Sequence, residues 1–372
     1  LYHLIFIVKI KNNMRVCILG SGLSALTLAK ALVNLKIFVD LVVLKKNYEI
    51  NKSRTIGISS SNVNYFNRNI ININKIIWKL NKIEIYSDNL KNEKLLNFEN
   101  NNKQLFSIVK NSQLYDLLIN NLIKNKYFKK IKMKKKFINQ KKYNLIINTD
   151  YKNYFSKKFF NKKIEKTYNS LAYTTVINHE KIINNFVAIQ IFTEKGPLAF
   201  LPISKNKTSI VYSIHNNKKY SREEINKLIH KYNLKYKIQS IENIESFNLK
   251  SFVLRSFYHE NILAFGDLLH RLHPLAGQGF NMTIRDVNVL INIINQKIDL
   301  GLPLDSSVNK QFEKKSKHTN YFFSNGIDLM YEFFNLERKF KNKILSQSVK
   351  LIGSNTYLNR FFTQVADKGL NF

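Results

Sequence analysis

The first part of the chain shows apolar runs and helical periodicity in the order strand, helix, strand. Residues 15–19 (RVCIL) form a short apolar run that ends in glycine, which predicts a buried strand. Apolar residues then recur at helical spacing over 23–35, and we expect a helix there. Residues 38–44 (FVDLVVL) form a second apolar run and predict a second strand. Together these elements predict a βαβ unit with parallel strands.

Strand-like and helix-like stretches continue along the rest of the chain, and no linker rich in Pro, Gly or Ser separates them. Alternating apolar and polar residues predict antiparallel strands within 70–106, and strand-like patterns dominate 171–213. Particular strands are expected at 143–148, 186–192, 208–214 and 261–265, and helices at 113–124, 221–232 and from 279 onward. The pattern indicates dinucleotide-type α/β segments interrupted by β-rich insertions.

The turn after the first strand carries a glycine motif. Residues 20–25 (GSGLSA) fit G-x-G-x-x-G/A between a strand and a helix, the context that dinucleotide binding requires. The first glycine permits a tight turn, the second lets a pyrophosphate approach the backbone, and the alanine allows close helix packing. The helix N-terminus adds free N–H groups and a partial positive charge. A purely structural turn is the alternative. The expected cofactor contacts are Gly20, Gly22, Leu23, Ser24 and Ala25.

One feature of dinucleotide-binding units is missing. The second strand of such a unit ends in an acidic residue that holds a ribose hydroxyl. Here Val43 stands in that position, followed by Leu44 and Lys45. The next acidic residue, Glu49, lies too far along the chain to serve. Either other groups hold the ribose, or the affinity for the cofactor is reduced.

A second cluster of glycines and polar residues lies far downstream. Gly266-Asp267 follow the strand expected at 261–265, and residues 270–281 read HRLHPLAGQGFN. A carboxylate at a strand end, directly after glycine, can accept a hydrogen bond from a ribityl or ribose hydroxyl. The loop Gly277-Gln278-Gly279 can lie flat against a ring system. The helix that starts near Phe280 directs its N-terminus at this loop and would stabilise negative charge on a reduced flavin.

Extended to Arg285-Asp286, this stretch closely resembles the group A flavin monooxygenases, the para-hydroxybenzoate hydroxylase-like superfamily, and within it the ubiquinone-biosynthesis hydroxylases. The shared pattern is GD-x-x-H-x-x-HP-x-AGQG-x-N-x-x-x-RD, without gaps. Residues 53–59 (SRTIGIS) are similar to the family's arginine segment, which implies that Arg54 contacts FAD. Residues 192–202 (FTEKGPLAFLP) are similar to the family's F-x-x-x-GP-x-A-x-LP stretch in the substrate domain.

The family's middle motif is altered in this chain. A strand followed by Ala-Asp-Gly in the family appears here as Asn148-Thr149-Asp150-Tyr151. Asp150 is kept and is expected to contact the cofactor, whereas Tyr151 replaces the glycine. Because the family uses this segment for FAD and for NAD(P)H, the change bears on how the reductant binds.

The resemblance implies an α/β fold. A discontinuous Rossmann-type FAD-binding domain is built around the GxGxxA turn and is joined by an inserted β-rich substrate domain and a C-terminal helical segment. The expected division assigns 14–70, 105–168 and 250–300 to the FAD-binding domain, 71–104 and 169–249 to the substrate domain, 301–372 to the C-terminal helices, and 1–13 to an upstream extension outside the natural product.

The activity implied by the resemblance is hydroxylation of an aromatic ring, with FAD as cofactor and NAD(P)H as reductant. Molecular oxygen adds at flavin C4a, and the hydroperoxide transfers OH to the ring, while the protein supplies position, electrostatics and exclusion of water. The expected catalytic residues are His273, Pro274 and Gln278. Besides the first turn, the expected cofactor contacts are Arg54, Asp150, Gly266, Asp267, Pro274, Gly277, Gln278, Gly279, Phe280 and Asn281.

Two histidines in the second motif have two interpretations. His270 and His273 can act as acid and base, or they can fix the loop by hydrogen bonds. Arg285 and Asp286 are interpreted as a structural pair on a helix rather than a catalytic one. Metal catalysis is not expected, because the histidines lack ligand-type partners at suitable spacing.

The implied substrate is a polyprenyl-phenol or quinol precursor of ubiquinone, which resides in the bilayer. We therefore expect a cytoplasmic protein that associates peripherally with the inner (cytoplasmic) membrane and with a quinone-biosynthesis complex. Two alternatives stand beside this prediction. One is a catalytically impaired FAD-binding scaffold of such a complex, motivated by Val43 and Tyr151. The other is a flavoenzyme of the same fold that acts on another aromatic or isoprenoid substrate.

The net charge of +35, from 60 Lys and Arg against 25 Asp and Glu, raises the question of a nucleic-acid partner. Lys, Asn, Ile, Phe and Tyr are all abundant and share AT-rich codons, so a biased genome explains the charge without selection for it. No nucleic-acid-binding motif is present, and we expect no such partner. The basic run 129–142 is interpreted as a solvated face.

The single cysteine, Cys17, lies in the first apolar run, where we expect it to be buried, and it excludes a disulfide framework. No stretch reaches the roughly 18 apolar residues of a membrane-spanning helix.

Overall fold

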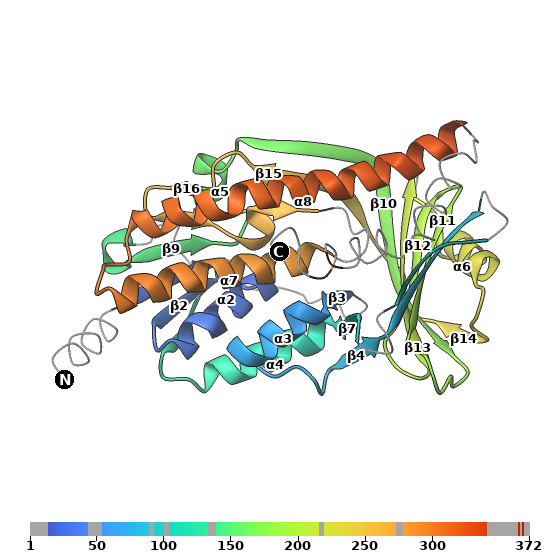
Figure 1. Cartoon of the computed structure of the whole chain (residues 1–372), viewed down its shortest axis with the longest axis horizontal. Coiled ribbons are helices and arrows are strands. Elements are labelled where there is room, and N and C mark those ends of the chain that lie inside the picture. Colours follow the sequence, from blue (N-terminus) through green and yellow to red (C-terminus); the bar gives the residue numbers. More distant parts are fainter. Residues whose placement is uncertain are drawn as a thin grey trace.

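A computed structural model gives the fold of the chain (Figure 1). It describes residues 14–43, 54–88, 93–99, 104–132, 139–215, 219–272 and 278–340, together with Gln364 and Asp367. Within these ranges, two large sheets lie at opposite ends of the molecule, and a long helix runs between them. The expectations for 1–13, for Leu44 and Glu49, and for 273–277 fall outside the described residues.

The first sheet is the mostly parallel one that the βαβ pattern predicts. Its order is β16-β17-β9-β1-β2-β8. β1 lies parallel between β2 and β9, and β17 lies parallel to β9 on the far side. Short apolar runs form these strands because both faces of such a sheet are covered. The strands are β1 (Arg15–Leu19), β2 (Phe38–Val43), β8 (Phe128–Lys132), β9 (Leu145–Asn148), β16 (Tyr258–His259) and β17 (Ile262–Ala264).

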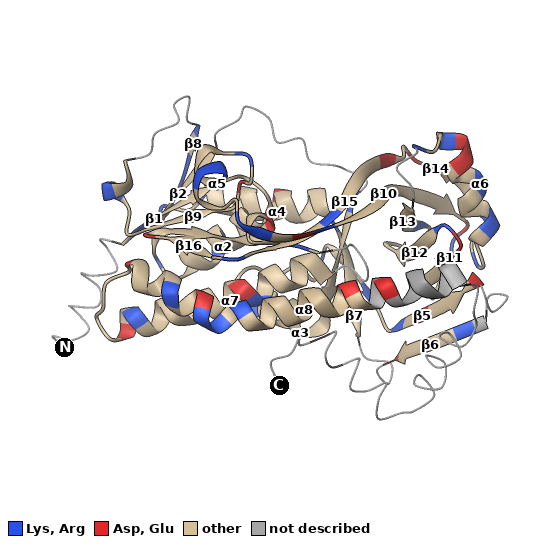
Figure 2. Ribbon diagram, turned by 90° about the horizontal axis from the view of Figure 1, so that it is seen from above, with Lys and Arg blue, Asp and Glu red and all other residues tan. Residues whose placement is uncertain are grey.

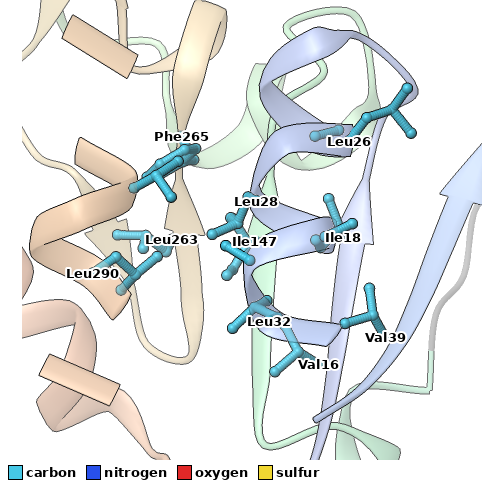
Figure 3. Packing of buried hydrophobic residues seen from close by; sticks show 14 of the residues in the cluster. Val16, Ile18, Leu26, Leu28, Leu32, Val39, Ile147, Leu263, Phe265 and Leu290 are labelled. Carbon is cyan, nitrogen blue, oxygen red and sulfur yellow. The ribbon is translucent and has the colours of Figure 1, made fainter. Parts of the chain in front are cut away.

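Two helices cover one face of this sheet, α2 (Leu23–Asn34) and α7 (Gln278–Asp299). The helix α4 (Asn111–Ile123) packs against α2. Figure 3 shows how side chains from the strands and both helices interdigitate. Each fully buried aliphatic side chain stabilises the fold by about 1.5–3 kcal/mol relative to an exposed one. The labelled residues are Val16, Ile18, Leu26, Leu28, Leu32, Val39, Ile147, Leu263, Phe265 and Leu290.

A small antiparallel sheet lies beside α7. Its order is β3 (Thr55–Ser59), β7 (Phe106–Lys110) and β4 (Ile77–Leu80). The helix α3 (Ser60–Asn69) begins directly after β3, and both elements contact α7. This arrangement brings the segment that contains Arg54 to the same side of the molecule as the second glycine motif.

The second large sheet has nine strands and is mostly antiparallel. Its order is β18-β15-β10-β13-β12-β11-β5-β6, and β14 pairs with β10. The helix α6 (Arg222–Tyr232) packs on one face through an apolar cluster that includes Tyr212 and Phe200, and Ser221 caps it in a capping box with Glu224. The strands are β5 (Lys82–Ser87), β6 (Glu93–Glu99), β10 (Lys163–His179), β11 (Val187–Thr193), β12 (Gly196–Pro202), β13 (Lys207–His215), β14 (Ile238–Ile241), β15 (Glu245–Leu254) and β18 (His270–Arg271).

The long helix α8 (Ser306–Phe340) joins the two ends of the molecule (Figure 1). Its first half packs on the parallel sheet, where Phe312 lies near Phe257 and Phe265. Farther along, Tyr321 donates a hydrogen bond to the carbonyl oxygen of Leu254 on β15, 3.1 Å away. A short helix, α5 (Tyr154–Phe159), follows β9.

Most of the expected elements are confirmed. The first strand, the first helix, the strands near 186–192 and 208–214 and the helix near 221–232 lie within two residues of their expected bounds. The expected helical region from 279 divides into α7 and α8. The sequence patterns did not predict β3, α3, β8 or α5. The domain division stays a prediction, and the long strands β10 and β15 cross its boundaries near 168 and 250.

Among the described residues, Lys and Arg lie on elements at both ends of the molecule, as codon bias would produce (Figure 2). In the basic run, Lys129, Lys130 and Lys132 of β8 are exposed, as expected for a solvated face. Cys17 is buried, and this burial raises the pKa of its thiol to about 12. Among the described helices, none combines the length and apolar character needed to cross a bilayer.

Candidate cofactor site

The two glycine motifs meet at one edge of the parallel sheet. β1, β9 and β17 are neighbours and run parallel. Their C-terminal ends therefore share an edge, which is where α/β folds bind cofactors. Gly20 follows β1, Thr149 follows β9, and Gly266 comes shortly after β17. Segments far apart in the sequence thus form one candidate site.

The position of Gly20 leaves no room for a side chain. Its φ is +120°, and a Cβ there would lie 2.2 Å from Oγ1 of Thr149. Thr149 is fixed in turn, because its Oγ1 and its backbone N–H both donate to the carbonyl oxygen of Leu19, each over 2.8 Å. Thr149 was not predicted as a site residue, since its role follows only from the pairing of β1 with β9.

Gly266 packs against the helix that the first motif opens. Its φ is +60°, and a Cβ there would lie 2.4 Å from Cβ of Ser24 and 2.6 Å from its Oγ. Ser24 stands in the first turn of α2, and Gly22 is the N-cap of that helix. Leu23 and Ala25 are buried in the same turn. The second motif therefore approaches the N-terminus of α2, where free N–H groups attract a pyrophosphate.

Two carboxylates lie at this edge, and they differ in their hydrogen-bond partners. Asp267 is exposed, and no described residue hydrogen-bonds to its carboxylate, which can therefore accept from a ligand hydroxyl. The carboxylate of Asp150 accepts a hydrogen bond from the backbone N–H of Lys152 at 2.8 Å, which closes a local turn. Tyr151 replaces the family's glycine without a positive φ, and its half-exposed ring lies 5.1 Å below the guanidinium of Arg271.

The N-terminus of α7 has room beside it. A Cβ added at Gly279 would meet no atom within 4 Å, so a flat ligand can approach its backbone. Gln278 is buried, and its Oε1 accepts a hydrogen bond from Arg285 at 3.2 Å. Phe280 is partly buried near Phe66, with ring centroids 6.4 Å apart. A helix end of this kind stabilises negative charge on a bound ring.

Asn281 lies in the site region, but its side chain is directed into the protein. Its Oδ1 accepts from the N–H of Ser59 and from Nδ2 of Asn62, each at 2.9 Å, and its Nδ2 donates to the carbonyl oxygen of Gly57 at 3.0 Å. The residue is fully buried. It therefore ties α7 to β3 and α3 and thereby positions the start of α7.

The structure pairs His270 with Asp286 in the interior. Nε2 of His270 lies 2.6 Å from Oδ2 of Asp286, and both residues are 2% exposed. This geometry favours the interpretation that His270 fixes the chain rather than serving as an acid or base in contact with substrate. His273, Pro274 and Gly277, also predicted for this site, lie outside the described residues.

Arg54 lies just before β3, at the junction with the nine-stranded sheet. Its guanidinium lies 5.9 Å from the ring centroid of Phe247 on β15, and the neighbouring Thr55 hydroxyl is 2.8 Å from that of Ser209. The two glycine motifs are brought together directly, and the contact of β3 with α7 links the segment of Arg54 to the second motif.

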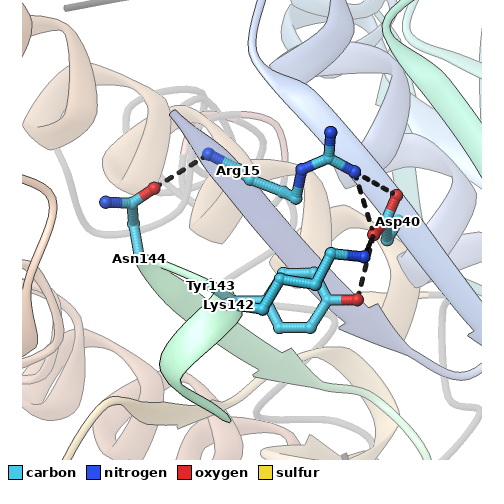
Figure 4. A network of polar contacts seen from close by, with 5 residues as sticks. All are labelled: Arg15, Asp40, Lys142, Tyr143 and Asn144. Carbon is cyan, nitrogen blue, oxygen red and sulfur yellow. Dashed lines mark hydrogen bonds and ion pairs between the residues drawn. The ribbon is translucent and has the colours of Figure 1, made fainter. Parts of the chain in front are cut away.

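The acidic residue of β2, Asp40, is bound by other side chains and does not stand at the strand end. Val43 ends the strand, as expected, and Asp40 in its middle is 1% exposed. Figure 4 shows that the carboxylate of Asp40 accepts from Arg15 and Lys142 at 3.2 Å and from Tyr143 at 2.9 Å. Burial opposes its ionisation, but these partners together lower the pKa of Asp40 below its ordinary value. Asp40 therefore cannot reach a ribose hydroxyl at the strand end.

These observations fit FAD. The crowded glycines Gly20 and Gly266 let the segments of the site pack closely beside the N-terminus of α2, where a pyrophosphate can bind. The carboxylate of Asp267 is available to a ribityl hydroxyl, and Gly279 leaves space for a flat ring. FAD carries negative charge on its pyrophosphate and, when reduced, on its ring, and the N-termini of α2 and α7 would stabilise these two charges.

Sequence comparison matches the chain to an FAD binding domain and to hydroxylases and monooxygenases. The profile described as FAD binding domain matches residues 165–299. The 3-demethoxyubiquinol 3-hydroxylase of Escherichia coli is 29% identical over 39% of this chain and 39% of its own length. The mitochondrial ubiquinone biosynthesis monooxygenase COQ6 of Xenopus tropicalis is 24% identical over 48% of this chain and 47% of its own length. The chain thus matches less than half the length of these curated relatives.

Solved structures share the whole fold. The p-nitrophenol 4-monooxygenase PnpA of Pseudomonas putida superposes with a TM-score of 0.76 at 11% identity, covering 94% of this chain and 97% of its own. HpxO of Klebsiella pneumoniae, solved with FAD and uric acid, gives a TM-score of 0.75 at 11% identity, covering 96% of this chain and 98% of its own. These likenesses confirm the expected α/β fold. The sequence matches support the resemblance to FAD-dependent hydroxylases, among them enzymes named for ubiquinone biosynthesis.

Proposed function

We propose that the chain is an FAD-dependent, NAD(P)H-using monooxygenase that hydroxylates the aromatic ring of a polyprenylated ubiquinone precursor. The observation that carries the proposal is the meeting of Gly20, Ser24 and Gly266 at one sheet edge, because it unites both halves of an FAD site. The named relatives supply the substrate class, since they act in ubiquinone biosynthesis by their names.

Each part of the site has its own role in this proposal. The N-terminus of α2 binds the pyrophosphate, and the carboxylate of Asp267 accepts a hydrogen bond from the ribityl chain. The backbone at Gly279 and the N-terminus of α7 would hold the ring and would favour negative charge on it. When bound, FAD supplies the electron transfer and the oxygen chemistry, and the protein positions the substrate and excludes water.

A buried apolar cluster lies between the second glycine motif and the nine-stranded sheet. In it Leu272, Met282 and Phe323 pack with Ile85 and Phe192 of that sheet. Apolar surroundings near the proposed flavin position suit an aromatic substrate with an isoprenoid tail. Association with a membrane surface and with a quinone-biosynthesis complex belongs to the same proposal, because such a substrate resides in the bilayer.

The first test is an absorbance spectrum of the purified protein, followed by anaerobic addition of NADPH and of NADH. Flavin bands that bleach with either reductant are expected. Addition of oxygen and a prenylated phenol should then restore the bands and yield a product heavier by one oxygen atom in mass spectrometry. A protein that stays colourless after incubation with FAD would contradict the proposal.

The alternative of an FAD-binding scaffold without turnover rests on two observations. β2 ends in Val43 rather than an acidic residue, and Tyr151 occupies the place of the family's glycine. Stable flavin bands that neither reductant bleaches would favour the scaffold. Bleaching and reoxidation without hydroxylation of the prenylated phenol, but with hydroxylation of another aromatic compound, would favour a flavoenzyme of the same fold with a different substrate.

A further inference from the structure

Two of the contacts between α8 and α7 lead to the second glycine motif. Asn320 and Phe323 stand about one turn apart on α8, so they present neighbouring side chains on one face. Asn320 is 4% exposed and Phe323 is 8% exposed. Their partners on α7 are the consecutive residues Asp286 and Arg285.

The first contact reaches His270. Nδ2 of Asn320 donates to Oδ1 of Asp286 at 3.1 Å, and Oδ2 of Asp286 lies 2.6 Å from Nε2 of His270. All three side chains are buried, so no water competes for these bonds. His270 is also held by its backbone, because β18 pairs with β15 at Val253. Asn320 thus orients the carboxylate that fixes His270.

The second contact reaches Gln278. The guanidinium of Arg285 lies 4.4 Å from the ring centroid of Phe323. From there it donates to Oε1 of Gln278 and to the carbonyl oxygen of Asn281, each at 3.2 Å. Burial lowers the pKa of Arg285 to about 10, so it stays charged at neutral pH. The charged donor and the ring below it hold Gln278 at the start of α7.

We infer that Asn320 and Phe323 are positioning residues of the flavin site, each acting through one residue of α7. The inference rests on the proposed function. Gln278 directly precedes Gly279 at the start of α7, and His270 follows Asp267 by three residues in the second glycine motif. A site keeps its geometry when a surrounding shell fixes the residues next to the ligand. α8 supplies that shell, although it carries none of the family's motif residues.

A control substitution on α8 distinguishes an effect on the flavin site from a general loss of stability. Asn309 is also buried on this helix and makes one described hydrogen bond through Nδ2, to the carbonyl oxygen of Glu260 at 3.1 Å. That bond is made to the turn before β17 and does not involve Asp286 or Arg285. Asn309→Leu and Asn320→Leu therefore remove comparable bonds from one helix, and only the second change acts on Asp286.

The experiment measures FAD affinity by flavin fluorescence, the shape of the visible flavin spectrum, and the thermal midpoint of the FAD-free protein. We expect Asn320→Leu and Phe323→Leu to raise the Kd for FAD about tenfold or more and to alter the flavin bands, as changes in a supporting shell do. Asn309→Leu should lower the thermal midpoint by a similar amount and leave the Kd within about twofold of wild type.

Substitutions at His270 extend the test to the first contact. His270→Gln retains a side-chain N–H that can donate to Asp286, whereas His270→Leu does not. We expect the glutamine variant to recover most of the FAD affinity that the leucine variant loses. If Asn320→Leu fails to fold, Phe323→Leu and this pair of variants carry the test.

The outcomes distinguish the two proposals. If the wild-type protein binds FAD and Asn320→Leu and Asn309→Leu change the Kd and spectrum equally or not at all, the positioning role is wrong and the proposed function stands. If the wild-type protein does not bind FAD, the proposed function fails and the inference fails with it. A changed Kd and spectrum in Asn320→Leu and Phe323→Leu, with Asn309→Leu unaffected, supports the inference.

Discussion

Gly266 and Ser24 come from opposite ends of the cofactor-binding sequence, yet a single methyl group on residue 266 would collide with the Ser24 side chain. The collision would involve Cβ of Ser24, which is attached directly to the helix backbone and cannot rotate away. This contact sets how closely the GD turn approaches the N-terminus of α2. The geometry of the cofactor site therefore depends on how these two residues pack.

Gly266→Ala should destabilise the FAD-free protein by about 2–4 kcal/mol. The change adds strain at a φ of +60° and overpacks Ser24. Ser24→Gly in the same chain removes the collision but not the backbone strain, so the double variant should recover part of the loss. Urea denaturation of the two single variants and the double variant gives the coupling energy. Strictly additive effects would show that residues 24 and 266 are not in contact.

Gly279→Ala and Gly326→Ala form a matched pair, because an added Cβ meets no atom within 4 Å at either position and both residues are helical. Alanine favours helix over glycine by up to about 1 kcal/mol, so neither change should destabilise the FAD-free protein. We expect Gly279→Ala to weaken FAD binding about tenfold or more, since the methyl group occupies space assigned to the flavin ring. Equal FAD affinity in both variants, measured by fluorescence titration, would place the ring elsewhere.

Asp40→Asn should show a stability difference that depends on pH. The partners of Asp40 hold its folded pKa below the ordinary value of 3.8, so its charged form stabilises the fold above that pH. The free energy of unfolding of the wild-type protein should exceed that of the variant by about 2–4 kcal/mol near neutral pH. The difference should shrink as the pH falls below 3.8 toward the lowered pKa. Thermal melts at several pH values test this, and a difference that grows on acidification would contradict it.

Asn281→Ala should cost about 3 kcal/mol, because it leaves the N–H of Ser59, the carbonyl of Gly57 and the amide of Asn62 without their buried partner. Asn281→Asp keeps an acceptor but loses the donor to Gly57 and buries a charge, so its loss should be greater above the pKa of the new carboxyl. Urea denaturation at two pH values measures both effects. Full stability in either variant would show that this tie between α7 and β3 is weak.

The sequence predicted the elements whose patterns are local. RVCIL, the GSGLSA turn and the helix after it are specified by neighbouring residues, and the structure has them at the expected places. Segment 60–69 (SSNVNYFNRN) has few apolar positions, so nothing local predicts α3; its packing on β3 and α7 forms it. The polar first half of β10 is a strand because β15 pairs with it.

Prediction of the site had a similar limit. The glycine motifs indicated the cofactor edge, but the direction of a side chain depends on tertiary contacts. Asn281 was expected to contact the cofactor, and its amide is directed toward β3 instead. The two interpretations of His270 could be separated only by finding Asp286 within hydrogen-bond reach. Thr149 could not be identified, because its role at Gly20 arises from the neighbouring strand β9.

The strand order of the parallel sheet has a consequence for synthesis on the ribosome. β9 pairs with β1 on one side and with β17 on the other, and β17 lies more than a hundred residues after β9 in the chain. While the nascent chain is shorter than this, β9 is an open edge that invites pairing with other chains. The nine-stranded sheet is largely translated before β17 emerges. Translation thus completes the cofactor edge late, and a chaperone that shields strand edges would act within this interval.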